Sequence, residues 1–111
     1  MAVIIKNIVP RRLAENIETI QYTAVGVKTV IDKFTITNVN TVNAALNVYL
    51  VAKGDTPSVS NLILNSRTLT PKESYTCPEL VGQVIEDGGY ISTKADTGGC
   101  LTISATGREI I

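Results

Sequence analysis

The sequence predicts an all-β protein: an antiparallel β-sandwich, jelly-roll-like, with about eight strands and an extended N-terminal arm. Thirty-nine of the 111 residues are Val, Ile or Thr, whose branched side chains are stiff about χ1 and pack well on a pleated sheet. From residue 18 onward, turn signals recur every 8–12 residues or so, which is typical of a sandwich or barrel. The strand number suits a jelly roll or an immunoglobulin-like sandwich, and the sequence does not decide between them.

The length of the chain suits one domain with a core that needs no metal or disulfide to hold it. We divide it into residues 1–17, an N-terminal arm or edge strand, and residues 18–111, the β-sandwich domain. The apolar side chains of the first segment belong to Ile4, Ile5, Ile8 and Val9. An arm of this kind can lie across a neighbouring subunit, as in strand addition at an exposed sheet edge. The alternative is that it forms the first strand of its own sheet.

Alternation of apolar and polar residues defines the early strands of the second segment. A short strand around Ile20 and Tyr22 ends near Gly26. The next strand covers residues 28–38, and its apolar face carries Val30, Phe34 and Ile36. Residues 44–52 alternate most clearly, with Tyr49 on the face opposite an inward stripe of Leu46, Val48, Leu50 and Ala52.

Turn residues separate the remaining strands. The Asn-rich link at residues 38–43 suits a connection between two strands, because Asn tolerates the left-handed region and bonds to its own backbone. Shorter strands are expected at 62–64, 74–76 and 90–93. The last strand has an inward face of Leu101, Ile103 and Ala105, and it continues past a bulge at Gly107.

The composition argues against catalysis. The chain contains no histidine, the side chain that most readily moves protons near pH 7 and the commonest metal ligand. Its absence removes the usual Ser-His and Cys-His machinery and most zinc sites. The ten acidic residues are scattered, with no spacing that favours a paired site. We therefore expect no enzyme, no catalytic residues, no cofactor and no metal.

Charge and hydropathy limit the classes of partner. Ten basic and ten acidic residues cancel, so nothing draws the chain toward nucleic acid. No apolar stretch approaches the roughly 20 residues of a membrane-spanning helix. Without signal-peptide features, the chain is expected to stay in the cytoplasm of the cell that makes it. Cys77 and Cys100 lie outside any CxxC pair and are expected to be reduced.

A low charge content points to an assembly. Charged residues make up 18% of the chain, against about 25% in an average soluble domain. The surface is therefore covered largely by Thr, Ser and Asn and is partly apolar, which suits a protein that is held among others. An ordinary neutral β-sandwich is the alternative. Asp32, near the apolar face of its strand, is expected to remain exposed to solvent or to form an ion pair with a Lys or Arg.

Several strand segments resemble small all-β virion proteins of tailed bacteriophages: Ile31–Asn38, Val48–Val51, Leu80–Gly82 and Leu101–Glu109. Within that class the chain is most similar to the capsid decoration (cement or staple) proteins of epsilon15-type short-tailed phages, over roughly residues 18–109. The resemblance implies a jelly-roll-like structural protein of the virion, which is located in the host cytoplasm during assembly. Such proteins bind the outer capsid surface and clamp neighbouring major capsid subunits, often as a homodimer about a local two-fold axis.

The expected contacts with the capsid or with a second copy come from the arm and one strand face. Ile4, Ile5, Ile8 and Val9 would supply buried side chains, Arg11 or Arg12 a polar rim, and Tyr49 a further contact. Two alternatives come from other classes of protein. A tail or neck adaptor would share the small sandwich and form a ring, and a carbohydrate-binding module would share the jelly roll. The absence of Trp counts against the second alternative.

Overall fold

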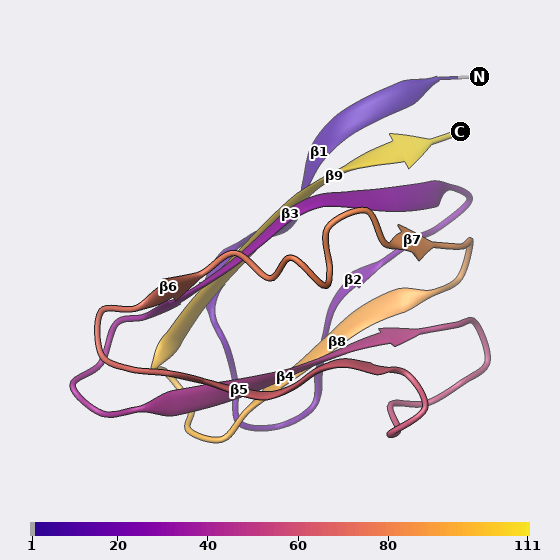
Figure 1. The fold of residues 1–111 in the computed structure, drawn as a ribbon. Coiled ribbons are helices and arrows are strands. Elements are labelled where there is room, and N and C mark those ends of the chain that lie inside the picture. Colours follow the sequence, from indigo (N-terminus) through magenta and orange to yellow (C-terminus); the bar gives the residue numbers. More distant parts are fainter. Residues whose placement is uncertain (1) are drawn as a thin grey trace.

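The computed structural model describes residues 2–111 as two antiparallel β-sheets packed face to face, which confirms the predicted β-sandwich (Figure 1). Sheet A has the order β1-β9-β3-β6, with β7 also pairing with β3, and sheet B has the order β2-β8-β4-β5. The strands are β1 Val3–Leu13, β2 Thr19–Thr23, β3 Lys28–Asn38, β4 Ala44–Val51, β5 Leu62–Leu69, β6 Ser74–Tyr75, β7 Val84–Ile85, β8 Tyr90–Ala95 and β9 Leu101–Ile110.

The pairings nest inside one another, as in a long hairpin that has been rolled up. β4 pairs with β5, β3 with β6 and β7, β2 with β8, and β1 with β9. From β1 to β4, consecutive strands alternate between the two sheets. This is the jelly-roll topology, so it decides between the two sandwiches that the sequence left open. It also brings the beginning of β1 beside the end of β9 (Figure 1).

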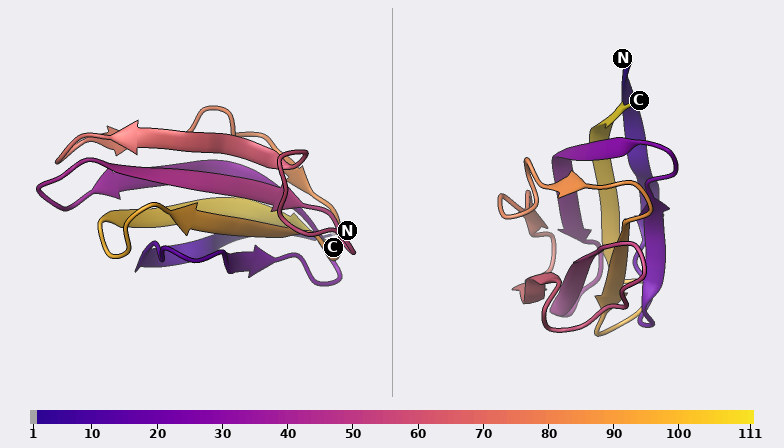
Figure 2. Two further views of the ribbon diagram at one scale, coloured as in Figure 1. Left: turned by 90° about the horizontal axis from the view of Figure 1, so that it is seen from below. Right: turned by 90° about the vertical axis from the view of Figure 1, so that its right-hand side faces the viewer.

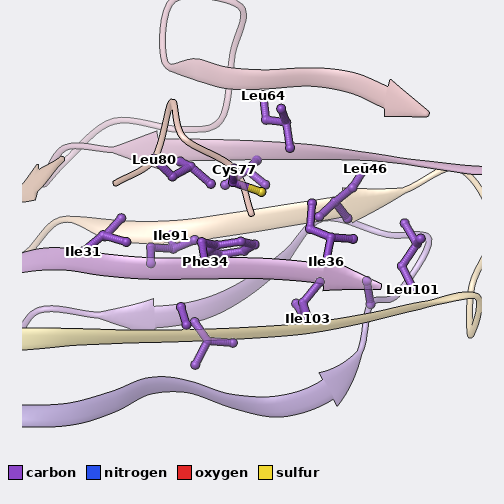
Figure 3. Packing of buried hydrophobic residues seen from close by; sticks show 14 of the residues in the cluster. Ile31, Phe34, Ile36, Leu46, Leu64, Cys77, Leu80, Ile91, Leu101 and Ile103 are labelled. Atoms are coloured by element: carbon purple, nitrogen blue, oxygen red, sulfur yellow. The ribbon is translucent and has the colours of Figure 1, made fainter. Parts of the chain in front are cut away.

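The core lies between the sheets (Figure 3). Sheet A contributes Phe34, Ile36 and Ile103, and these face Leu46, Leu64 and Ile91 of sheet B. Cys77 and Leu80, from the segment between β6 and β7, are fully buried in the same cluster. Both cysteines are free thiols, as expected. Burial raises the pKa of the Cys77 thiol to about 12, which keeps it protonated and unreactive.

A bulge in β3 corrects the predicted face of Val30. Ile31 pairs with Gly107 and Lys33 pairs with Thr106, so Asp32 is an extra residue between them. Alternation restarts after the bulge. Ile31 is therefore buried where Val30 was expected, while Phe34 and Ile36 point inward as predicted.

Three other strand expectations need correction. β5 continues to Leu69, well past the predicted end at residue 64, through a polar stretch that shows no apolar alternation. Ala52 lies beyond the end of β4 and is exposed. At Gly107 the register does shift, but the extra residues lie on the neighbouring strands β1 and β3 rather than on β9.

Candidate interaction surface

The N-terminal segment is an edge strand of the chain's own sheet. β1 pairs with β9 from Val3 to Leu13, and within residues 2–111 no strand lies on its other side. Ile8 and Val9, expected to be buried in a partner, are instead 3% and 1% exposed within this chain's own core. The pairing of Val9 with Ala105 brings them over that core, so neither is a surface contact.

The other expected contact residues are scattered over the surface. Ile4 and Ile5 are exposed, but alternation along the strand puts them on opposite faces of sheet A. Arg11 and Arg12 are exposed in the second half of β1. Tyr49 lies on β4 of the other sheet and is only 9% exposed, so most of its ring is unavailable to a partner. The structure therefore does not bring these residues together.

Ile5 instead belongs to a surface that the sequence did not reveal. Register aligns Ile5, Arg108, Val30 and Val84 in one row across β1, β9, β3 and β7. Beside it runs a second row of Val3, Ile110 and Lys28. The five aliphatic residues of these rows lie on the outer face of sheet A, and we call them the end patch: Val3, Ile5, Val30, Val84 and Ile110.

The end patch lies where sheet A reaches past the rest of the molecule. β1 and β9 extend above the strands of sheet B at this end (Figure 2, right), and β3 reaches the same row, since Lys28 pairs with Ile110. Ile5 is 82% exposed there, and Val3 and Val84 are about half exposed. Exposed aliphatic side chains grouped in this way mark contact surfaces, whereas single exposed ones do not.

The two cations that lie in the rows of the end patch, Arg108 and Lys28, each have a counter-ion within the chain. Arg108 makes a two-pronged ion pair with Asp32, with Nη2 2.9 Å from Oδ1 and Nε 3.0 Å from each carboxylate oxygen. Lys28 lies 3.6 Å from Glu86. The pair at Arg108 confirms the expectation for Asp32. Because Arg108 and Lys28 already have counter-ions, a partner can cover their two rows without leaving either cation unpaired.

A polar cluster under the patch joins the two sheets. The Tyr22 hydroxyl, from sheet B, donates to Glu109 and lies 2.7 Å from the Thr29 hydroxyl. Lys6 lies 3.4 Å from the same carboxylate. The Tyr22 hydrogen bond lowers the pKa of Glu109, as does Lys6, while burial opposes them. Burial, reinforced by Glu109, raises the pKa of Tyr22 to about 12. The cluster fastens the projecting strands to the opposite sheet.

Backbone groups of β1 form the rim of the patch. The amide of Ile111 donates to the carbonyl of Ala2 at 2.9 Å, and antiparallel positions alternate between bonding inward and outward. Val3 and Ile5 therefore direct their N–H and C=O groups away from β9. Pro10 has no N–H to offer and, with Arg11, blunts the second half of this edge. The first half stays open to another strand.

Comparison of the chain with models of protein families, with curated proteins and with solved structures gave no match. Within residues 2–111 there is no helix of the length and hydropathy that crossing a membrane requires. The same part of the chain has no group of three His, Cys, Asp or Glu side chains placed to hold a metal ion.

Proposed function

We propose that this protein is a structural component of a virion, which binds the outer surface of a capsid and clamps neighbouring major capsid subunits. The observation that carries the proposal is the end patch, because it offers apolar side chains and charges that are already paired. Interfaces are depleted of free charge at their centre and surrounded by a polar rim. The resemblance of the strand segments to capsid decoration proteins supports the same function.

The patch explains how a small protein can stabilise a large shell. Each copy contributes a modest apolar contact, and the symmetry of the shell repeats that contact at every equivalent position. When one copy contacts two subunits, the subunits cannot separate unless the copy loses its contacts with one of them. The hydrogen bond between Tyr22 and Glu109 holds the strands of the patch rigidly against sheet B. A force between capsid subunits would therefore be resisted by the contact and would not simply bend these strands.

We propose further that the protein is a homodimer formed through β1. Antiparallel pairing of the open edge at residues 3–6 with the same edge of a second copy would join two copies of sheet A. Val3 and Ile5 lie on that edge, so the two end patches would become neighbours. One continuous apolar strip would then lie across the boundary between two capsid subunits.

Co-sedimentation with capsid shells stripped of their decoration protein tests the function. We expect saturable binding at a whole-number ratio to capsid subunits. Ile5→Asp places a charge in the patch and should abolish binding. Val42→Asp is the matched control, since Val42 is about as exposed as Val3 and lies in the β3–β4 loop at the other end of the sandwich.

Substitution is a sharper test than deletion. Removing residues 1–12 would take away most of β1 and uncover the core around Val9, so lost binding could reflect lost folding. If Ile5→Asp and Val42→Asp bind equally well, the end patch is not the contact. If the parent protein does not bind shells at all, decoration is wrong, and a ring assembly in electron micrographs would favour a tail or neck adaptor.

A further inference from the structure

A shallow hollow of about 180 Å³ lies on the outer face of sheet B, the side of the sandwich opposite the end patch. It is lined by Ala45, Asn47, Tyr49, Ser66, Lys94, Ala95 and Asp96. These residues come from β4, β5 and β8, which lie side by side in Figure 2, left, and from Asp96 directly after β8. The hollow is smaller than the roughly 300–1,000 Å³ pockets of drug-sized ligands.

Contacts within the chain fix the orientation of the polar groups. The backbone N–H of Ser66 donates to Asn47 Oδ1, and the Ser66 hydroxyl donates to the same atom at 3.1 Å. The amide of Asn47 is thereby oriented, and its NH₂ group lies 3.5 Å from the Tyr49 hydroxyl. Ser66 reaches this place through a backbone φ of +50°, which a non-glycine residue adopts only when its surroundings compensate for the strain.

Hydrogen-bonding capacity is left over on both sides of the hollow. Lys94 lies opposite Asn47 in the sheet, and it takes part in none of the three ion pairs formed by residues 2–111. Asp96 accepts the Ala45 N–H at 2.9 Å through Oδ1, so its second carboxylate oxygen is available. The hollow thus presents donors on Lys94, Asn47 and Tyr49 and an acceptor on Asp96.

We infer that this hollow binds one neutral pyranose unit of a glycan. Each sugar hydroxyl both donates and accepts, so it matches a site that holds both kinds of group at fixed positions. The positive Lys94 and the negative Asp96 leave the hollow without net charge, which disfavours an anionic sugar or a free phosphate. Tyr49 is too buried to stack broadly on a sugar ring, so recognition depends on hydrogen bonds.

The inference does not rest on capsid decoration, although the two fit together. A protein that docks through the outer face of sheet A leaves the outer face of sheet B exposed to the medium. Copies repeated over a shell would then bind a surface glycan far more tightly than one copy can. A single shallow site on its own is expected to bind weakly.

Titration of the ¹⁵N-labelled protein with methyl α-glucoside, methyl α-galactoside and methyl α-mannoside tests the inference by NMR. We expect saturable shifts for at least one sugar, confined to amides of residues 45–49, 66 and 94–96. Lys94→Gln and Asp96→Asn should each weaken that binding about tenfold or more, because a buried sugar hydroxyl loses its charged partner.

Lys33→Gln is the matched control, since it makes the same charge change on the outer face of sheet A and should leave sugar binding unchanged. The inference is overturned if none of the three sugars gives saturable shifts, if the shifts lie elsewhere, or if Lys94→Gln binds as the parent does. Shell binding by Lys94→Gln should be normal, so failure here is distinguishable from failure of the decoration proposal.

Discussion

The hydroxyl of Tyr22 on β2 donates a hydrogen bond to the carboxylate of Glu109 on β9, and this contact ties sheet B to the projecting end of sheet A. The two residues are 87 positions apart in sequence. The rolled hairpin brings them together, since β2 and β9 belong to neighbouring pairs of the nest. The same hydroxyl contacts Thr29 on β3, so one atom of sheet B is bonded to two neighbouring strands of sheet A.

Tyr22→Phe should lower the free energy of unfolding by about 1–3 kcal/mol, because the ring stays while a partly buried carboxylate loses its donor. Urea unfolding followed by circular dichroism measures the change. Tyr90→Phe is the control: its hydroxyl only contacts the Asp55 carbonyl at the surface, at 3.2 Å, and should matter by less than about 0.5 kcal/mol. Equal effects of the two substitutions would contradict a special role for Tyr22.

Acid should weaken the fold through Glu109. Its pKa is lower in the folded chain than the ordinary value of 4.5, chiefly because of the Tyr22 hydrogen bond. The unfolded chain therefore binds more protons as the pH falls, so the stability that Glu109 contributes is present above about pH 4.5 and is lost as the pH falls through the folded pKa. Unfolding curves between pH 3 and pH 7 should show a shallower loss in Glu109→Gln than in the parent. Parallel pH profiles would exclude Glu109 as a source of the acid sensitivity.

The strands and their faces were largely predictable, because alternation with period two is a local property. β9 shows this best: Leu101, Ile103 and Ala105 are buried as predicted, with half-buried Thr and Ser residues between them. The face of Val30 was wrong because a bulge depends on the partner strand. Asp32 is the extra residue of β3 at the place where Gly107 of β9 lies against the β3 backbone, and nothing local to β3 indicates it.

The candidate interaction surface was predictable only in part, because it depends on which strands become neighbours. Ile5 was expected as a contact, but Val30 joins it only because β9 pairs with both β1 and β3, and Val84 joins it only through the pairing of β7 with β3. β7 is two residues long and has no strand pattern of its own. The expectation for Ile8 treated β1 as an arm, and a sequence cannot distinguish an apolar arm from an apolar edge strand.

Gly107→Ala should destabilise the fold by about 1–3 kcal/mol. A Cβ at this position would lie 2.5 Å from the backbone oxygen of Val30 and 3.2 Å from Cδ1 of Ile8. The carbonyl cannot retreat without disturbing the ladder between β3 and β9. Gly98→Ala is the control, since its new Cβ would find its nearest neighbour, Asn16, at 3.7 Å. Thermal unfolding of both variants checks this, and a stable Gly107→Ala would mean that the strands can separate there.

Asp32→Asn should separate stability from binding. The pair with Arg108 is partly exposed, with side-chain exposures of 38% for Asp32 and 46% for Arg108, so removing its negative charge should cost little stability. Binding to capsid shells should nevertheless weaken about tenfold or more, because the partner must then cover an unpaired guanidinium. Asp55→Asn, in the β4–β5 loop, makes the same change of charge and should bind normally. If Asp32→Asn binds shells as tightly as the parent protein does, the Asp32–Arg108 pair is not part of the interface.

Ile5→Pro tests the dimer through the backbone alone. The N–H of Ile5 points away from β9, so proline removes no bond of the chain's own ladder and is tolerated on such an edge. A second copy of β1 would lose a hydrogen bond and meet the proline ring. Ile5→Ala removes most of the same side chain but keeps the N–H. In sedimentation equilibrium we expect Ile5→Pro to be monomeric and Ile5→Ala to keep a dimer. If both variants dimerise, the copies meet elsewhere; if both are monomeric, side-chain contacts and not strand pairing hold the dimer together.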